Sequence, residues 1–225
     1  MPPSRRGDLD GWWRFGLALF APIAAAAFRL RVIGERSVPD GAAVLAANHV
    51  SGLDGPVLAI VTGARARRMT RFLVAADFFS KRSFGWALRL YRQIPVHRGR
   101  GDAVALAEAI ETVALGALAG IFPEGHVSPD PAAGLQRVRT GVARIALTAR
   151  APVVPVGIWG TQRRWPLSGL HARRPYRPVV AVAFGEPIEP VGDAAVVDDV
   201  EAFAGVVRSA LEAQVAIARS SAGPD

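Results

Sequence analysis

Short apolar runs of strand length alternate with stretches of helical pattern along most of this chain of 225 residues. Buried strands of a parallel sheet read as such runs, and the helices that cover the sheet lie between them. The alternation therefore predicts an α/β domain with a mixed, mostly parallel sheet flanked by helices. We expect strands at 30–33, 44–47, 71–75, 94–96, 119–122, 153–158 and 179–184. We expect helices at 56–61, 84–91, 102–118, 138–149 and 198–218.

No low-complexity linker divides the chain, and its length suffices for one substantial core. We expect a membrane-associated helical segment at 1–30, one folded domain at 31–219 and a disordered tail at 220–225.

The composition is both apolar and basic. Hydrophobic residues make up 51% of the chain, and the mean hydropathy is +0.24. The 27 Lys and Arg residues exceed the 19 Asp and Glu residues, which gives a formal net charge of +8. This combination favours contact with an anionic membrane surface. The absence of cysteine excludes a thiolate nucleophile, a disulfide framework and any Cys-ligated metal.

The amino-terminal segment combines arginines, tryptophans and an apolar stretch. Arg5 and Arg6 precede Trp12 and Trp13, and the apolar stretch covers 16–28. A helix of about thirteen residues reaches about 20 Å, which is short of the roughly 30 Å hydrocarbon core. We therefore expect it to enter one leaflet, with both tryptophans at headgroup depth. The alternative is an Ala-rich helix packed on the domain. A signal peptide is not indicated, because no polar cleavage region follows the apolar stretch.

A histidine and an aspartate follow the apolar run 44–47. His49 would end the strand, and Asp54, five positions later, would enter the next helix. Across such a turn a carboxylate oxygen can accept a hydrogen bond from the imidazole Nδ1–H, which leaves Nε2 free to take a proton. The pair is therefore a candidate general base. Alternatively, Asp54 only caps a helix that starts near Pro56, with Ser51 sharing this task.

Two other predicted strands also end in polar residues. Arg98 follows the strand at 94–96, and Glu124 and Gly125 follow the strand at 119–122. Arginine can hold a phosphate through two parallel hydrogen bonds, and Glu124 could orient a hydroxyl, a backbone amide or an arginine. A solvated basic loop and a surface turn are the alternative interpretations.

A proline interrupts one of the apolar runs. Pro155 lies within 153–158, and because proline cannot donate to a sheet ladder, it predicts an edge strand or a bulge.

The order of these signals resembles that of the glycerolipid acyltransferase family, the 1-acylglycerol-3-phosphate O-acyltransferases. The resemblance covers roughly residues 30–190. It depends on four motifs, which are Asn48-His49-x4-Asp54, Ile94-Pro95-Val96-His97-Arg98, Phe122-Pro123-Glu124-Gly125 and Val154-Pro155-Val156. It implies a monotopic membrane enzyme, on the cytoplasmic face, that moves a fatty acyl group from acyl-CoA or acyl-carrier protein to a lysophospholipid. The implied product is phosphatidic acid.

The resemblance also implies roles for individual residues. His49 and Asp54 would be catalytic, Arg98 would contact a phosphate, and Glu124 and Gly125 would shape the acceptor site. Because the chain has neither cysteine nor a Gly-x-Ser-x-Gly elbow, a covalent intermediate has no evident nucleophile. His49 would instead activate the acceptor hydroxyl for direct attack on an acyl thioester.

The chain departs from the family pattern beside these motifs. His97 stands where the family often has an acidic or amide residue, and His126 and Val127 stand where it usually has threonine and arginine. Ser128 is retained, and we include His126 and Ser128 in the predicted acceptor site. Since Val127 lacks the charge of the family's arginine, another lyso-lipid or a glycolipid is the alternative acceptor.

The expected reaction uses no cofactor beyond the acyl donor. The histidines and carboxylates match no metal-ligand spacing, so we expect no metal. We expect no nucleic-acid partner, because no basic face interleaved with stacking aromatics is apparent. The expected partners are membrane lipid and either acyl-CoA or acyl-carrier protein. A basic membrane-binding protein without catalytic activity is the alternative from another class.

Overall fold

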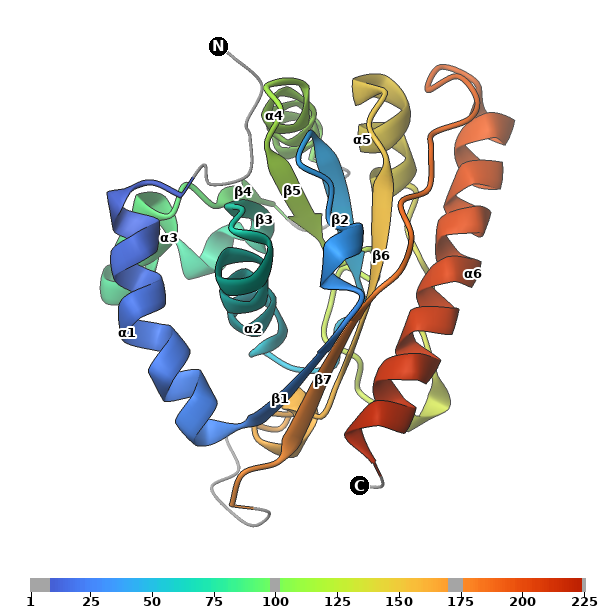
Figure 1. Ribbon diagram of the computed structural model, residues 1–225. Coiled ribbons are helices and arrows are strands. Elements are labelled where there is room, and N and C mark those ends of the chain that lie inside the picture. The colour runs from blue at the N-terminus through green and yellow to red at the C-terminus, as the bar shows by residue number, and fades with distance from the viewer. Residues whose placement is uncertain (1–8, 98–101, 170–175, 224–225) are drawn as a thin grey trace.

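Residues 9–97, 102–169 and 176–223 are described in the computed structural model of the protein. Their strands form one seven-stranded sheet (Figure 1). The strands are β1 (Arg29–Ile33), β2 (Ala43–Ala47), β3 (Thr70–Ala75), β4 (Ile94–Val96), β5 (Leu118–Ile121), β6 (Val153–Trp159) and β7 (Val179–Phe184). Their order is β1-β7-β6-β2-β5-β3-β4, and only β6 and β7 pair antiparallel. The predicted mixed, mostly parallel sheet is confirmed.

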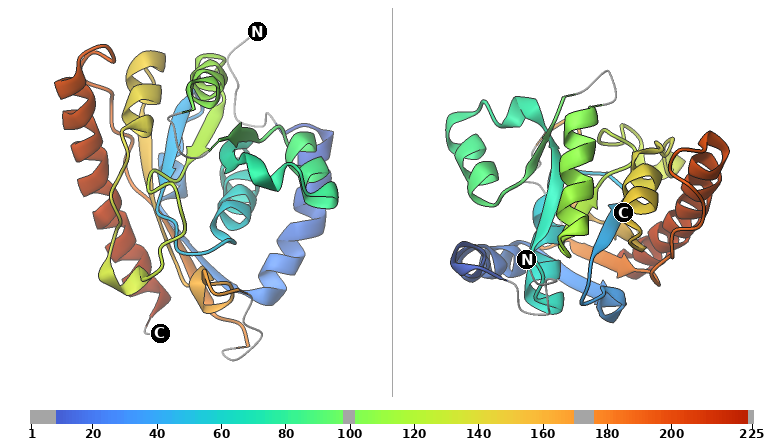
Figure 2. Two further views of the ribbon diagram at one scale, coloured as in Figure 1. Left: turned by 180° about the vertical axis from the view of Figure 1, so that it is seen from behind. Right: turned by 90° about the horizontal axis from the view of Figure 1, so that it is seen from above.

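Helices cover both faces of this sheet (Figure 1, Figure 2). They are α1 (Gly11–Ala27), α2 (Asp54–Val61), α3 (Arg82–Leu90), α4 (Ala103–Ala114), α5 (Gly141–Ala149) and α6 (Val197–Ala222). In the central strand β2, Val44 and Ala46 pack with residues of α4, α5 and α6, whereas Ala43 and Leu45 pack with residues of α2. Every residue of β2 is buried, which explains why this strand reads as a continuous apolar run.

The predicted helix at 102–118 ends earlier in the structure. α4 stops at Ala114, and Gly116 follows with a φ of +85°, a value that glycine adopts without strain. Leu118 then begins β5, which lies between β2 and β3. The apolar pattern of helix and strand is continuous here, so only this glycine marks the boundary.

The closing helix is longer than predicted. α6 extends to Ala222, so residues 220–222, which we expected to begin a disordered tail, continue the helix. The guanidinium of Arg163 donates to the carbonyl of Ala222 at 3.2 Å and to that of Gly223 at 2.6 Å. Arg31 donates to the carbonyl of Ser221 at 2.7 Å. Tertiary hydrogen bonds, which local sequence does not reveal, therefore hold the last turn.

Pro155 lies in a central strand, so the prediction of an edge strand is wrong. β6 runs between β2 and β7, and all its residues are buried. On the β7 side the ladder begins at Val156, and an isolated bridge joins Val153 to Ile188. Between these two, the carbonyl of Pro155 accepts from the N–H of Gly185 at 2.8 Å. The N–H that proline lacks thus coincides with a gap in the ladder.

Helix α1 packs one face on the domain and exposes the other. Trp13 is 6% exposed and packs edge-on against Tyr91, so the predicted headgroup contact is open only to Trp12. The exposed large apolar side chains of α1 are Trp12, Phe15, Leu19, Phe20 and Ile23. Within the described ranges, no helix is both long and apolar enough to cross a membrane.

Candidate active site

The carboxyl ends of three neighbouring strands bring polar side chains together. His49 follows β2, Glu124 follows β5 and Thr161 follows β6. Strand β2 lies between β5 and β6 and is parallel to both, so the three ends meet at one edge of the sheet. In open α/β sheets this edge is the usual place for a ligand site.

His49 and Asp54 form the predicted pair. Nδ1 of His49 lies 2.9 Å from Oδ2 of Asp54. The imidazole stacks on the ring of Phe122, with centroids 4.2 Å apart and planes inclined by 20°. The side chain of His49 is 19% exposed, and no described residue forms a hydrogen bond with its Nε2. A substrate can therefore reach the outer nitrogen of an otherwise fixed ring.

Asp54 is fully buried and receives donors from three other residues as well. Its Oδ2 also accepts from the backbone N–H groups of Val50 at 2.7 Å and Ser51 at 2.8 Å. Its Oδ1 accepts from the hydroxyl of Thr161 at 2.6 Å. A carboxylate in this setting favours Nδ1 of His49 as the protonated nitrogen, which leaves Nε2 as the acceptor. Asp54 begins α2, but its side chain is directed to residues 49–51, here called the histidine turn, and does not serve only as a helix cap.

Glu124 connects two backbone segments of the site. It is 1% exposed, its Oε1 accepts from the N–H of His49 at 2.6 Å, and its Oε2 accepts from the N–H of Gln136 at 3.0 Å. Burial raises the pKa of Glu124, and the two backbone hydrogen bonds act against that rise. Both carboxylate oxygens therefore hold the protein's own backbone, and the predicted contact of Glu124 with an acceptor stays a prediction.

The backbone on both sides of His49 is fixed by further hydrogen bonds. The side chain of Asn48 accepts from the N–H of Ile158 at 2.7 Å and donates to its carbonyl at 3.0 Å, so it extends the pairing of β2 with β6. The N–H of Ser128 donates to the carbonyl of His49 at 2.7 Å. The Ser128 hydroxyl accepts from the side chain of Gln136 at 3.2 Å. Ser128, predicted to bind substrate, is buried and supports the histidine turn.

The other predicted acceptor residues form an exposed turn. Gly125 has a φ of +77°, and a Cβ built there would lie 3.0 Å from Nε of Arg139. His126 is exposed beside it. The guanidinium of Arg139 therefore lies against this turn near the end of β5.

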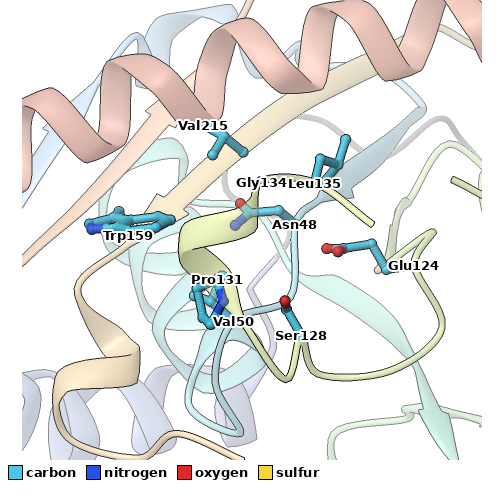
Figure 3. A pocket seen from close by; sticks show the side chains of 9 residues that line it. All are labelled: Asn48, Val50, Glu124, Ser128, Pro131, Gly134, Leu135, Trp159 and Val215. Carbon is cyan, nitrogen blue, oxygen red and sulfur yellow. The ribbon is translucent and has the colours of Figure 1, made fainter. Parts of the chain in front are cut away.

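A small pocket lies beside the histidine turn (Figure 3). The residues that line it are Asn48, Val50, Glu124, Ser128, Pro131, Gly134, Leu135, Trp159 and Val215. The space enclosed by these residues suffices for little more than a single water molecule. We interpret it as a packing gap beside the His49–Asp54 pair, here called the dyad, rather than a place for a lipid.

Arg98, the predicted phosphate ligand, lies outside the described residues. The described residues on either side of it form a second histidine–aspartate pair with the same spacing, in which Nδ1 of His97 lies 3.0 Å from Oδ2 of Asp102. Asp102 is also the N-cap of α4, where its side chain accepts from the backbone N–H groups of Val104 and Ala105. Backbone hydrogen bonds from His97 and Ala105 lower its pKa to about 2. Unlike His49, the side chain of His97 is 77% exposed.

Metal ligands are not gathered anywhere in the described part of the chain, where no group of three or more His, Cys, Asp or Glu side chains is placed to hold an ion.

The sequence patterns do not identify Thr161 or Gln136 as site residues. Thr161 nevertheless carries a usable signal, because it is a polar residue just beyond the buried strand β6, as His49 is beyond β2. Gln136 contributes its backbone N–H, which no residue type reveals.

Comparison with known proteins supports the resemblance drawn from the motifs. A family model described as Acyltransferase matches residues 29–159, which is more than half of the chain. The matched range contains His49, Asp54 and Glu124 and ends two residues before Thr161.

Similar proteins occur in mycobacteria. Uncharacterised proteins of Mycobacterium tuberculosis (strain ATCC 25618 / H37Rv) and Mycobacterium bovis are each 31% identical over 150 residues, which is 62% of this chain and 40% of theirs. An uncharacterised protein of Mycobacterium leprae is 31% identical over 196 residues, which is 72% of this chain and 51% of that protein. The chain thus spans 40–51% of the length of these relatives.

A solved structure shows the same fold. The crystal structure of the 1-acyl-sn-glycerophosphate (LPA) acyltransferase PlsC from Thermotoga maritima matches with a TM-score of 0.72 and 24% identity. The match covers 95% of this chain and 81% of that chain.

Proposed function

The chain belongs to the acyltransferase family, and on this basis we propose that it transfers a fatty acyl group from an acyl thioester to the hydroxyl of a lysophospholipid. The donor is acyl-CoA or acyl-carrier protein. The acceptor that we expect is 1-acylglycerol-3-phosphate, which would give phosphatidic acid. The Thermotoga maritima protein of the same fold is named for this acceptor, which supports the choice.

The hydrogen bond of 2.9 Å between Nδ1 of His49 and Oδ2 of Asp54 carries the proposal. In the proposed mechanism, Nε2 of His49 removes the proton from the acceptor hydroxyl while the oxygen attacks the thioester carbonyl. An ester C–O bond forms, the thioester C–S bond breaks, and the imidazolium returns its proton to the departing thiolate. Asp54 holds the ring in orientation and stabilises the imidazolium. No acyl-enzyme and no further cofactor are needed.

The acceptor's phosphate needs cations, and we assign it to Arg98 and Arg139. Arg98 is proposed from its motif, and Arg139 from its place over Gly125. Arg139 would supply the charge that Val127 lacks, since a guanidinium can bind phosphate from either position. If it does not, the substitution at Val127 favours the alternative acceptor, a different lyso-lipid or a glycolipid.

We also propose that the protein is monotopic and lies on the cytoplasmic face of a membrane through α1. The exposed large apolar residues of this helix are Trp12, Phe15, Leu19, Phe20 and Ile23. An aromatic and aliphatic face of this kind is typical of helices that lie in the interface of a bilayer.

The test is to incubate purified protein with labelled acyl-CoA and a panel of lyso-lipids and glycolipids, and to identify each product by its mass. We expect acylation of 1-acylglycerol-3-phosphate, and its loss in the His49→Ala variant. Transfer only to another acceptor would establish the alternative. No His49-dependent transfer from acyl-CoA or acyl-carrier protein to any acceptor would contradict the proposal and leave a basic membrane-binding protein.

A further inference from the structure

Helix α3 and the turn before it form an exposed aromatic surface that the proposed chemistry does not use. The segment 76–90, here called the α3 surface, is inserted between β3 and β4 and stands away from the sheet (Figure 1, Figure 2). Trp86 is 61% exposed, Phe84 47% and Phe78 37%. The rings of Phe78 and Phe84 pack edge-on with centroids 5.7 Å apart, and Trp86 lies on the same helix as Phe84. Soluble domains seldom leave several large aromatic side chains exposed on one short segment unless that segment contacts something.

Cations are interleaved with these rings. The surface carries Lys81, Arg82 and Arg89, against a single acidic residue, Asp77. The ammonium of Lys81 lies 4.7 Å from the ring centroid of Phe78. Rings beside basic side chains suit the headgroup region of an anionic bilayer, where the rings lie among the lipid backbones and the cations meet phosphates. A second copy of the chain would instead place like charges against each other.

Tyr91 joins this surface to α1. Its ring packs edge-on against Trp13 at 5.4 Å between centroids, and its hydroxyl donates to the carbonyl of Trp12 at 3.4 Å. A Cβ at Gly16 would lie 2.3 Å from the Tyr91 hydroxyl, so this glycine permits the close approach. Helices α1 and α3 therefore lie together on one flank of the molecule, remote from α6 (Figure 1, Figure 2).

We propose that the α3 surface is a second membrane contact, which binds the headgroups of anionic lipids beside the contact made by α1. The inference rests on the proposed function in that the acceptor is a membrane lipid. A single helix lying on a bilayer can roll about its axis. A second contact, displaced from that axis, fixes which face of the domain meets the lipid and thereby sets the orientation of the dyad.

The test measures binding to vesicles, using the His49→Ala protein so that no turnover alters the lipid. In one variant Phe84 and Trp86 are changed to serine. The matched control changes Val206 and Ile217, which are 52% and 42% exposed on α6, to serine. On vesicles of phosphatidylglycerol and phosphatidylcholine we expect the aromatic variant to bind at least about tenfold more weakly, and the control to bind as the parent does.

A second variant changes the charge and leaves the rings in place. Replacing Lys81 and Arg82 by glutamine is expected to weaken binding about fivefold per cation on the mixed vesicles and to have little effect on pure phosphatidylcholine. Circular dichroism melting curves check that each variant is folded.

Binding of the aromatic variant equal to that of the control would overturn the inference, as would concentration-dependent dimerisation of the parent that the same substitutions abolish. The two proposals can fail separately. Vesicle binding that depends on α3, without acylation of any acceptor, would contradict only the proposed function. His49-dependent acylation with binding that is indifferent to α3 would contradict only this inference.

Discussion

The buried carboxylate of Glu124 accepts a hydrogen bond from the backbone N–H of His49 at 2.6 Å. Its other oxygen accepts from the N–H of Gln136, so one side chain ties the histidine turn to the loop that follows β5. Glu124 therefore acts on the position of the proposed base, whatever else it touches.

Replacing Glu124 by glutamine should lower kcat with little change in the acceptor KM. The amide has one acceptor oxygen for two N–H groups, and leaving a buried N–H unpaired costs about 1–3 kcal/mol. We expect a fall in kcat of about tenfold or more, measured with labelled donor. Glu111, exposed on α4, provides the control as Glu111→Gln and should behave as the parent. A raised acceptor KM with kcat preserved would instead indicate direct contact with the acceptor.

The stability contributed by Glu124 should depend on pH with a definite sign. Burial raises its pKa above the ordinary 4.5, so the folded chain holds this proton more tightly than the unfolded chain does. The contribution is then complete below pH 4.5 and is lost as pH rises through the raised pKa. Urea denaturation of the parent and of Glu124→Gln across this range should show their difference in unfolding free energy falling with pH. A difference that grows with pH would show that the pKa is lowered instead.

Thr161 should support catalysis through Asp54. Valine at this position keeps the shape but removes the hydroxyl that donates to Oδ1 of Asp54 at 2.6 Å. The unpaired buried oxygen should cost about 1–3 kcal/mol of stability, and kcat should fall by about tenfold with the acceptor KM preserved. Thr161→Ser, which retains the donor, should restore most of the activity. Full activity in the valine variant and a loss in the serine variant would show that the methyl packing matters and the hydrogen bond does not.

Only one of the two histidine–aspartate pairs should be catalytic. His49→Ala should lower kcat by about 10²–10⁴-fold, the usual contribution of a general base. His97→Ala removes an imidazole with the same spacing to its aspartate, but one that is 77% exposed and follows the edge strand β4. Its kcat should stay within about threefold of the parent. Comparable losses in both variants would mean that the difference in exposure does not distinguish the catalytic histidine from His97.

Much of this site could be predicted because polar residues follow the ends of its apolar strands. Apolar runs such as 44–47 and 119–121 are followed within three residues by His49 and by Glu124, and parallel strands bring such ends together. The distance between His49 and Asp54 then follows from one local turn. The sequence is informative wherever the relevant contact is local.

The remainder depends on contacts between distant segments. Asp54 and Thr161 are 107 positions apart, and nothing in the pattern of either segment indicates that they meet. Pro155 reads as an edge-strand residue, but the gap in the ladder that accommodates it is set by where β7 ends. The side-chain hydrogen bonds of Glu124 likewise join it to Gln136 and to His49, which lie 12 and 75 positions away.

The hydrogen bonds from Arg163 to the final carbonyls of α6 have a practical consequence. Arg163 and Thr161 belong to the same short 3₁₀ turn. The end of α6 is therefore connected, through this turn, to the residue whose hydroxyl donates to Asp54. An affinity tag fused after Gly223, or trimming of the last helical turn during purification, would disturb that link. Preparations of the protein that differ only in this carboxyl-terminal segment would then differ in specific activity, although every residue around the imidazole is the same.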